Sequence, residues 1–306
     1  MIVVDFNQAM LAAINVHRGD EFHKGKDPSL IGGMIRHMLL NMLLSYKKKY
    51  GQKYGNIVLA CDSRSYWRRD HYWWYKGHRK HDREESQFDW KVIFDTIEDV
   101  KKELRENFRY IILDVPGAEA DDIIGVLCKY LQDHETEQVG LFNDEPQEVL
   151  IISSDGDFGQ LQKYKNVSQF SPILKKMLKV PGRLEDFVME HIVKGDTGDN
   201  IGNIFTSVQW SIDRANGVKP KKQTPVKAAK LEEFFKNGRA ACSSDLEREN
   251  FDRNEELVSF DRIPQRIYDK VVGEYTNYVV TGSRTKVYNY LLKHKMKVLI
   301  NDAGSF

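Results

Sequence analysis

Short apolar runs rich in β-branched residues alternate with long amphipathic helix patterns over about the first 170 residues, and this alternation constrains the fold most. The apolar runs lie at residues 2–4, 57–61, 110–113 and 149–152. Apolar residues recur at spacings of three and four, as on one helix face, at residues 29–50, 89–107 and 120–134. Strands joined by helices form parallel sheets covered on both sides. We therefore expect an α/β fold with a mostly parallel central sheet and helices on both faces.

The pattern changes after Pro181, where helical segments continue with few strand-like runs. The chain has 306 residues, 41% of them hydrophobic and 30% charged, which is typical of a soluble globular protein with a large core. We place a catalytic domain at residues 1–180 and a smaller helical C-terminal region at residues 181–306. An acidic stretch, residues 135–148, is expected to form a surface loop.

Acidic side chains follow the predicted strands at the point where each strand ends. They are Asp5, Asp62 and Asp155 after the first, second and fourth strands, and Glu119, Asp121 and Asp122 in the segment PGAEADD after the third. The carboxyl ends of parallel strands meet at one edge of a sheet, so these groups are expected to share a small volume. Any one of them alone is more often a helix N-cap. Clustered carboxylates, however, are costly unless a cation neutralises them.

Two further pairs of carboxylates extend this set. Asp157 follows Asp155 across Gly156, and Asp196 and Asp199 stand three apart in GDTGDN. Oxygen ligands without nearby His or Cys suit Mg²⁺ or Mn²⁺ better than zinc. The carboxylates exceed what one ion needs, and two ions can activate water and stabilise the leaving oxygen in phosphoryl displacement. The predicted metal ligands are Asp5, Asp62, Glu119, Asp121, Asp122, Asp155, Asp157, Asp196 and Asp199.

Basic and aromatic residues are interleaved from residue 64 to residue 83. Cationic groups can neutralise phosphates while aromatic faces stack on unpaired bases, as expected of a track for a single strand. The alternative is a helix whose aromatic side chains pack on the core while its basic side chains extend into water. The two interpretations are compatible. Lys76 and Arg79, one helical turn apart, could hold the scissile phosphate, and Tyr75 could stack on a terminal base. The predicted nucleic-acid contacts here are Arg64, Arg68, Arg69, Tyr75, Lys76 and Arg79.

A second basic stretch carries Lys219, Lys221 and Lys222, which could contact duplex phosphates or simply be solvated. The net charge of only +1 does not by itself favour a nucleic-acid partner, but these two basic segments provide strong local fields. Three cysteines without paired spacing indicate reduced thiols. Neither a signal peptide nor a membrane-spanning run is apparent, so we expect a cytoplasmic protein with no membrane contact.

Five sequence blocks, taken together and in this order, resemble the 5′ nuclease or flap endonuclease superfamily, and within it the T-even-type bacteriophage ribonuclease H group. They are VVDFNQ, ACDSRSYWRRD, AEADD, ISSDGDFGQL and GDTGDN, and they cover residues 1–204. The resemblance implies a 5′ to 3′ exonuclease and flap endonuclease that removes RNA primers and adjacent DNA from lagging-strand fragments. It implies two Mg²⁺ ions, for which Mn²⁺ can substitute.

The resemblance also assigns roles to matching residues. Catalytic roles fall to Asp5, Asp62, Asp122, Asp155, Lys76 and Arg79. A helical arch is implied at about residues 64–88, and a helix-hairpin-helix-like DNA-binding element in residues 181–306. The implied substrates are flapped, forked or nicked DNA and RNA–DNA hybrid. A monomer is implied, with a single-stranded DNA-binding protein and a sliding clamp as partners in the host cytoplasm.

Two other functions remain open from the sequence. A PIN-type ribonuclease would use a similar acidic cluster to cut single-stranded RNA, although the long basic segment and GDTGDN do not favour it. A non-catalytic, structure-specific DNA-binding protein would use the acids only as helix caps, but negative charge beside phosphate gains nothing for a pure binder. A phosphatase of the haloacid dehalogenase type needs a DxD motif, which Asp5-Phe6-Asn7 lacks.

Overall fold

A computed structural model describes residues 1–17, 22–134, 136–139 and 143–306. Its centre is a six-stranded sheet in the order β3-β2-β1-β6-β7-β8. The strands are β1 (Ile2–Asp5), β2 (Ile57–Cys61), β3 (Ile111–Asp114), β6 (Val149–Ile152), β7 (Val167–Ser171) and β8 (Lys176–Leu178). All neighbours pair in parallel except β7 and β8, which pair antiparallel. The predicted mostly parallel α/β sheet is confirmed.

The strands bury both faces, because successive side chains point to opposite sides of a sheet. Ile2 and Val4 belong to one hydrophobic core and Val3 to the other. The first core is covered by α1 (Phe6–His17), α2 (Pro28–Tyr54), α5 (Trp90–Asn107), α12 (Arg284–Lys293) and α13 (Lys297–Ile300). The second is covered by α6 (Ala120–Tyr130), α11 (Gln265–Thr276) and the 3₁₀ helix η2 (Asp157–Lys163). The sheet is thus the middle layer of three.

Two of the long helices begin at aspartate caps. The side chain of Asp27 accepts from Ser29 N before α2, and that of Asp89 accepts from Val92 N before α5. Such caps bond backbone N–H groups that have no partner within the helix. The helix starts therefore follow from local sequence. None of the helices in the described residues is long and apolar enough to cross a membrane.

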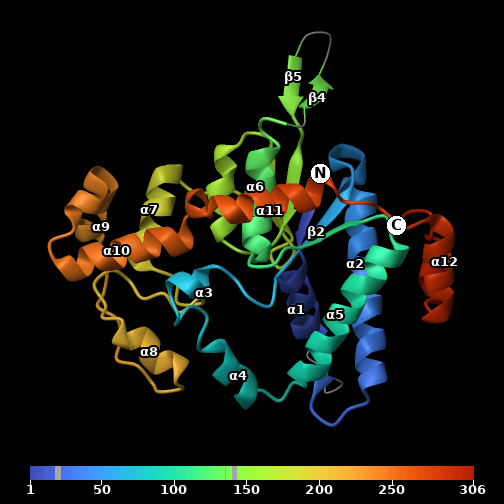
Figure 1. The fold of residues 1–306 in the computed structure, drawn as a ribbon, viewed down its shortest axis with the longest axis horizontal. Coiled ribbons are helices and arrows are strands. Elements are labelled where there is room, and N and C mark those ends of the chain that lie inside the picture. The colour runs from blue at the N-terminus through green and yellow to red at the C-terminus, as the bar shows by residue number, and fades with distance from the viewer. Residues whose placement is uncertain (18–21, 135, 140–142) are drawn as a thin grey trace.

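A smaller hydrophobic core lies apart from the sheet, at the left of Figure 1. It is built by α7 (Leu184–Lys194), α9 (Ala228–Asn237), the 3₁₀ helix η3 (Gly238–Ala241) and α10 (Asp245–Val258). The chain then returns through η4 (Phe260–Arg262) to place α11, α12 and α13 on the sheet layers. Residues beyond 180 therefore contribute to each of these three cores and to a fourth cluster, where Leu257 and Val258 pack against Tyr72 and Tyr75. The domain boundary near residue 180 stays a prediction.

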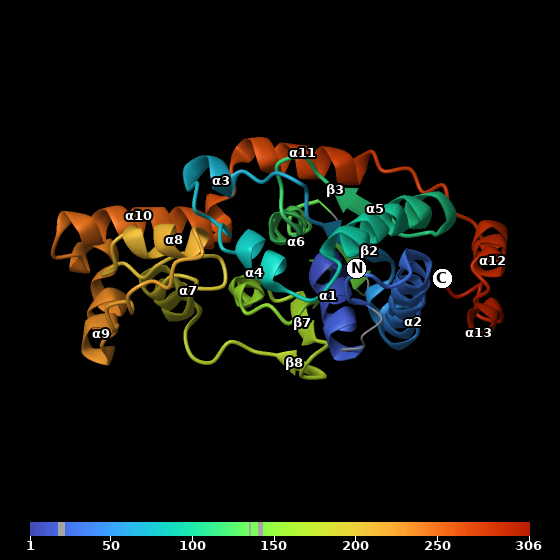
Figure 2. The same cartoon turned by 90° about the horizontal axis from the view of Figure 1, so that it is seen from below.

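The basic segment between β2 and α5 runs along the C-terminal edge of the sheet (Figure 2). It forms two short helices, α3 (Arg68–His71) and α4 (Arg79–Glu85), joined by turns. Helix α4 packs against α8 (Gln209–Ala215), and a Cβ atom at Gly77 would lie only 2.8 Å from that of Ala215. The segment from residue 64 to residue 88, called the arch below, is thus docked on the C-terminal region.

Parts of the sheet differ from the sequence-based expectation. The predicted loop at residues 135–148 contains an antiparallel hairpin of β4 (Thr136–Val139) and β5 (Asn143–Pro146), which projects at the top of Figure 1. Residue 135 and residues 140–142 of that loop lie outside the described residues. Strands β7 and β8 were not predicted, nor was helix α1, which starts directly after β1.

Candidate active site

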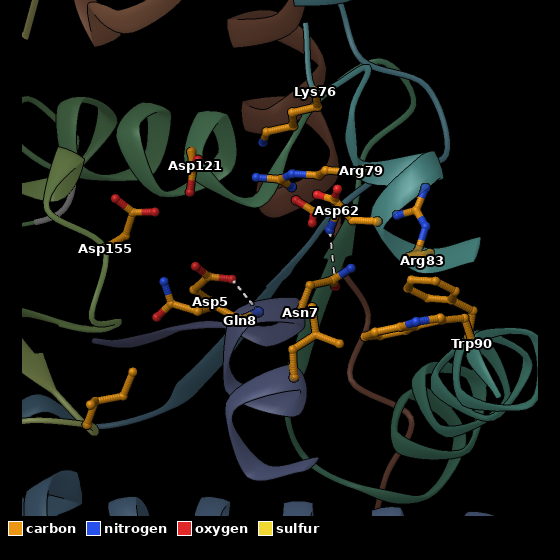
Figure 3. A pocket seen from close by; sticks show the side chains of 14 residues that line it. Asp5, Asn7, Gln8, Asp62, Lys76, Arg79, Arg83, Trp90, Asp121 and Asp155 are labelled. Carbon is orange, nitrogen blue, oxygen red and sulfur yellow. Dashed lines mark hydrogen bonds between the residues drawn. The ribbon is translucent and has the colours of Figure 1, made fainter. Parts of the chain in front are cut away.

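Four carboxylates from the ends of strands and the start of a helix meet in one cavity at the C-terminal edge of the sheet (Figure 3), and a fifth, Asp82 of α4, also lines it. Asp5 ends β1, Asp62 follows β2, Asp121 lies in the first turn of α6, and Asp155 follows β6. The cavity has a volume of about 470 Å³. The parallel register of the sheet therefore brings together residues separated by up to 150 positions in the sequence.

Cationic side chains of the arch form the opposite wall of this cavity. Lys76, Arg79 and Arg83 line it, together with the aromatic rings of Trp90 and Phe94 from α5. Figure 3 shows Lys76 and Arg79 extending toward the region between Asp62 and Asp121. Asp5, Asp62, Asp121 and Asp155, called the acidic floor below, therefore face the three cations of the arch, called the roof. The space between them can admit a phosphodiester.

Burial and nearby carboxylates make three of these side chains, Asp5, Asp62 and Asp121, hard to ionise. Burial, Asp62 and Asp155 together raise the pKa of Asp5 from 3.8 to about 7. Burial, Asp155 and Asp5 raise the pKa of Asp121 well above its ordinary value. Burial also raises the pKa of Asp62, although Lys76 opposes this. Ionising these carboxylates together therefore needs more positive charge than the surrounding protein supplies, which favours a bound cation.

Two of these carboxylates also act as helix caps. Asp5 accepts a hydrogen bond from Gln8 N at 3.1 Å, and Asp62 accepts one from Ala120 N at 2.8 Å. Individual carboxylate oxygens therefore do cap helix starts, which is the alternative that the sequence left open. It does not account for the convergence of four carboxylates on one cavity.

Glu119 and Asp122 form a separate, buried and neutralised group. Arg68 Nη1 donates to Glu119 Oε2 at 2.9 Å and to Asp122 Oδ1 at 2.8 Å, and the three side chains are 3%, 2% and 0% exposed. Trp67 Nε1 also donates to Asp122, at 3.1 Å. This differs from two expectations. Asp122 does not line the cavity, and Arg68 is an internal counter-ion with no surface to offer a phosphate.

Asp199 holds the arch in place. Its carboxylate accepts from Tyr75 Oη at 2.7 Å and from Arg79 Nη2 at 2.8 Å, and lies 3.5 Å from Lys76 Nζ. Burial opposes ionisation, but Lys76 and Arg79 outweigh it and lower the pKa of Asp199. Lys76 Nζ also pairs with Glu119 Oε1 at 2.6 Å. Lys76 has the unusual φ of 54°, and its backbone N–H donates to Asp199 O.

These contacts correct the expectation for Tyr75. Its ring is only 2% exposed and its hydroxyl donates to Glu119 and Asp199. The structure therefore places Tyr75 inside the arch and not on a face where a base can stack.

Asp157 and Asp196 form a second acidic group beside Asp155. Burial, Asp155 and Asp196 raise the pKa of Asp157 well above its ordinary value, and burial and Asp199 raise that of Asp196. His191 Nε2 lies 3.5 Å from Asp157 Oδ1. Neither aspartate lines the cavity. Within the described part of the chain, no three His, Cys, Asp or Glu side chains are already placed to hold one ion together.

Two family models match the chain over adjoining segments. Residues 32–190 match the family described as 5′–3′ exonuclease, N-terminal resolvase-like domain. Residues 182–306 match the family described as T4 RNase H, C terminal. The chain belongs to the 5′–3′ exonuclease family. The resemblance of the five sequence blocks to 5′ nucleases is thereby confirmed.

A curated relative supports the same assignment. The chain is 36% identical over 256 residues to the ribonuclease H of Enterobacteria phage T4, covering 82% of this chain and 79% of that protein. This match favours the predicted 5′–3′ exonuclease family over the PIN-type ribonuclease and the non-catalytic binder that the sequence left open.

Solved structures share the fold of the chain. The T5 5′-exonuclease with bound divalent zinc ions has a TM-score of 0.58 and 19% sequence identity, over 90% of this chain and 98% of that one. A complex of the bacteriophage T5 flap endonuclease with DNA and metal ions has a TM-score of 0.56 and 18% identity, over 90% and 97% of the two chains.

Several residues of the 5′ nuclease site were not singled out from the sequence. Arg83 lines the cavity with Lys76 and Arg79, and the three-and-four spacing of these bases could have indicated a shared face. Asn7 Oδ1 accepts from Asp62 N at 3.4 Å, and Gln8 Oε1 accepts from Ser154 N at 2.7 Å. Both amides belong to the VVDFNQ block, but the motif did not indicate that they bond the backbone beside Asp62 and Asp155.

The remaining predicted nucleic-acid contacts lie on the surface. Arg64 and Arg69 are exposed on the arch, and Lys219, Lys221 and Lys222 are exposed in the stretch that follows α8. Their contact with nucleic acid stays a prediction.

Proposed function

We propose that the chain removes RNA primers and adjoining DNA from 5′ ends, and cuts flaps, by metal-dependent hydrolysis of phosphodiester bonds. The observation that carries the proposal is the cavity in which Asp5, Asp62, Asp121 and Asp155 face the cations of the arch. Negative charge on the floor suits metal ions, and positive charge on the roof suits phosphate. Metal ions and cationic side chains together offset the repulsion between an anionic substrate and an acidic site.

The floor fits Mg²⁺, with Mn²⁺ as a substitute, because its candidate ligands are carboxylate oxygens and the pKa values of Asp5 and Asp121 among them are raised. Asp5, Asp62, Asp121 and Asp155 would hold one ion, and the group of Asp157 and Asp196 would help to hold a second. Such ions supply a nucleophilic water and stabilise the leaving oxygen.

Lys76 is suited to stabilise charge and not to accept a proton. Burial lowers the pKa of its ammonium, but Asp199 and Glu119 outweigh burial and raise it well above 10.5. The side chain therefore stays charged at neutral pH. Arg79 is 44% exposed at the rim of the cavity and Arg83 lies one turn further along α4, so both can bind the phosphate that enters.

The substrate class is inferred from the family and from the surface. The named relatives are a ribonuclease H, a 5′-exonuclease and a flap endonuclease, one of them seen with DNA. The arch beside the cavity offers Arg64 and Arg69 to a single strand, and the exposed lysines after α8 can contact duplex phosphates. We further infer a monomer that acts in the host cytoplasm with a single-stranded DNA-binding protein and a sliding clamp.

The test is cleavage of two 5′-labelled substrates, a flapped DNA duplex and an RNA-primed duplex, in Mg²⁺ and in EDTA. We expect wild type to release short 5′ products from both in Mg²⁺ and none in EDTA. Asp155→Asn should bind the flap in Ca²⁺ but lose cleavage, while Asp269→Asn, an exposed aspartate of α11, should cut like wild type. Full activity of Asp155→Asn would contradict the metal assignment, and binding without cleavage by wild type would contradict the proposed reaction.

A further inference from the structure

Arg253 on α10 is a half-buried cation whose hydrogen-bond partners are all uncharged. Its Nη1 donates to Asn250 Oδ1 at 2.7 Å, and its Nη2 donates to Asn254 Oδ1 at 2.7 Å and to Gly202 O at 3.1 Å. Burial lowers the pKa of its guanidinium. Among the residues that the structure describes, no carboxylate lies within ion-pair distance of it. Keeping a charge partly away from water without a counter-ion costs free energy. We therefore expect the hydrogen bonds of Arg253 to serve a specific structural purpose.

The two asparagines complete this task. Asn254 Nδ2 donates to Ile192 O at 2.8 Å and to Gly202 O at 3.1 Å, and Asn250 Nδ2 donates to Ile204 O and Thr206 O, both at 3.0 Å. Asn250, Arg253 and Asn254, called the α10 clamp below, therefore bond the carbonyl of Ile192 near the end of α7 and three carbonyls of the turn between α7 and α8. Carbonyls at a helix end and in a turn have no partner in a helix or strand ladder, so other groups must supply one.

The same turn carries the GDTGDN segment and closes tightly on itself. Gly195 has a φ of 65°, and a Cβ atom there would lie 2.6 Å from the carbonyl oxygens of both Ile201 and Gly202. Only glycine fits this approach. The carbonyl of Gly202 is thus the point at which the start of the turn, its end and the α10 clamp meet.

The outer side of the turn supports the arch. Asp199 O accepts from Lys76 N at 2.9 Å, and Asn200 Nδ2 donates to Trp74 O at 2.9 Å. Arg253 also reaches the arch directly, because its guanidinium lies over the Tyr72 ring, 5.1 Å from the centroid. One residue of α10 therefore contacts both the turn and the arch that the turn supports.

We propose that Arg253 is a positioning residue for the 5′ nuclease reaction, which fixes the turn at residues 195–202 and through it sets Lys76 and Arg79 over the acidic floor. The inference rests on the proposed function. Arg253 does not touch the substrate in this scheme and acts through Asp199, whose carboxylate binds both cations.

The test compares Arg253→Met with Arg248→Met, a matched change on the same helix at a partly exposed arginine that pairs with Asp245 and donates to Cys242 O, away from the arch and the turn. Single-turnover cleavage of the flap is measured in Mg²⁺, flap binding in Ca²⁺, and folding by thermal unfolding. We expect Arg253→Met to cut about tenfold or more slowly, with flap affinity within about threefold of wild type. Arg248→Met should match wild type in all three assays.

A double variant separates positioning from general loosening of the fold. If Arg253 acts through Asp199, adding Arg253→Met to Asp199→Asn should slow cleavage by less than about threefold beyond Asp199→Asn alone, because the two changes break one linkage. Independent, multiplicative losses would overturn the proposal, as would an Arg253→Met rate equal to that of Arg248→Met. If Arg253→Met does not fold, Arg253→Lys, which keeps the charge but not the fork of donors, is judged by the same criteria. Failure of wild type to cut would instead refute the proposed function.

Discussion

Replacing Asp5 by asparagine is expected to stabilise the folded protein at pH 8 in EDTA while abolishing cleavage in Mg²⁺. Burial and the neighbouring Asp62 and Asp155 raise the pKa of Asp5 from 3.8 to about 7. Between these two pH values the folded state binds more protons than the unfolded state. Stability therefore falls as pH rises through this window, and the cost is fully present above pH 7.

The size of the effect follows from the pKa. The rise from 3.8 to about 7 corresponds to about 4 kcal/mol, at 1.36 kcal/mol per pH unit. The hydrogen bonds from Gln8 N and Ser153 Oγ oppose this rise in pKa, so their effect is already contained in the figure. We expect Asp5→Asn to be more stable than wild type by up to about 4 kcal/mol at pH 8. This advantage should vanish at about pH 4.

The assay is urea unfolding of both proteins at several pH values from 4 to 8 in EDTA, with Asp269→Asn on the surface of α11 as control. The difference in unfolding free energy between Asp5→Asn and wild type should grow with pH, and that of the control should stay flat. A variant that is less stable than wild type at pH 8, or a difference independent of pH, would refute the electrostatic reasoning.

The other predictions concern the cations of the site. Lys76→Ala is expected to slow single-turnover cleavage by about 10²-fold, as for loss of a group that stabilises the transition state, with flap affinity in Ca²⁺ within about threefold of wild type; an unchanged rate would remove Lys76 from the site. Arg68→Met is expected to lower the unfolding free energy by about 3 to 5 kcal/mol at pH 7, because it leaves Asp122 buried without its counter-ion and removes one of the two cations that pair with Glu119. Urea unfolding measures this, and a loss below about 1 kcal/mol would show that the ion pairs are not needed.

The sequence predicted the strands whose composition is purely apolar, and it failed where polar residues are buried. Runs such as residues 57–61 and 149–152 became β2 and β6 as expected. Strand β7 reads Val-Ser-Gln-Phe-Ser and was missed. Its buried Gln169 is satisfied by the carbonyls of Ser153 and Asp155, and its Ser171 bonds Ser154. Because such hydrogen-bond partners come from another part of the chain, the local sequence of β7 does not predict that its polar residues are buried.

The acidic floor was predictable because it follows from the order of the predicted parallel strands. Asp5, Asp62 and Asp155 end parallel strands, and topology alone brings them together. The pairing of acids with bases was not predictable. Arg68 and Arg69 are adjacent in the sequence, yet Arg68 is buried between two carboxylates and Arg69 is exposed. Only the path of the arch decides which base becomes a counter-ion and which stays available for nucleic acid.

The account depends most directly on divalent ions binding at the acidic floor. Crystals grown with Mn²⁺ and measured at the manganese absorption edge locate such ions by anomalous scattering. We predict anomalous peaks within coordination distance of the carboxylates of Asp5, Asp62, Asp121 and Asp155, and their loss in Asp155→Asn crystals. Manganese bound only outside this cavity, with the floor carboxylates uncoordinated, would contradict the account.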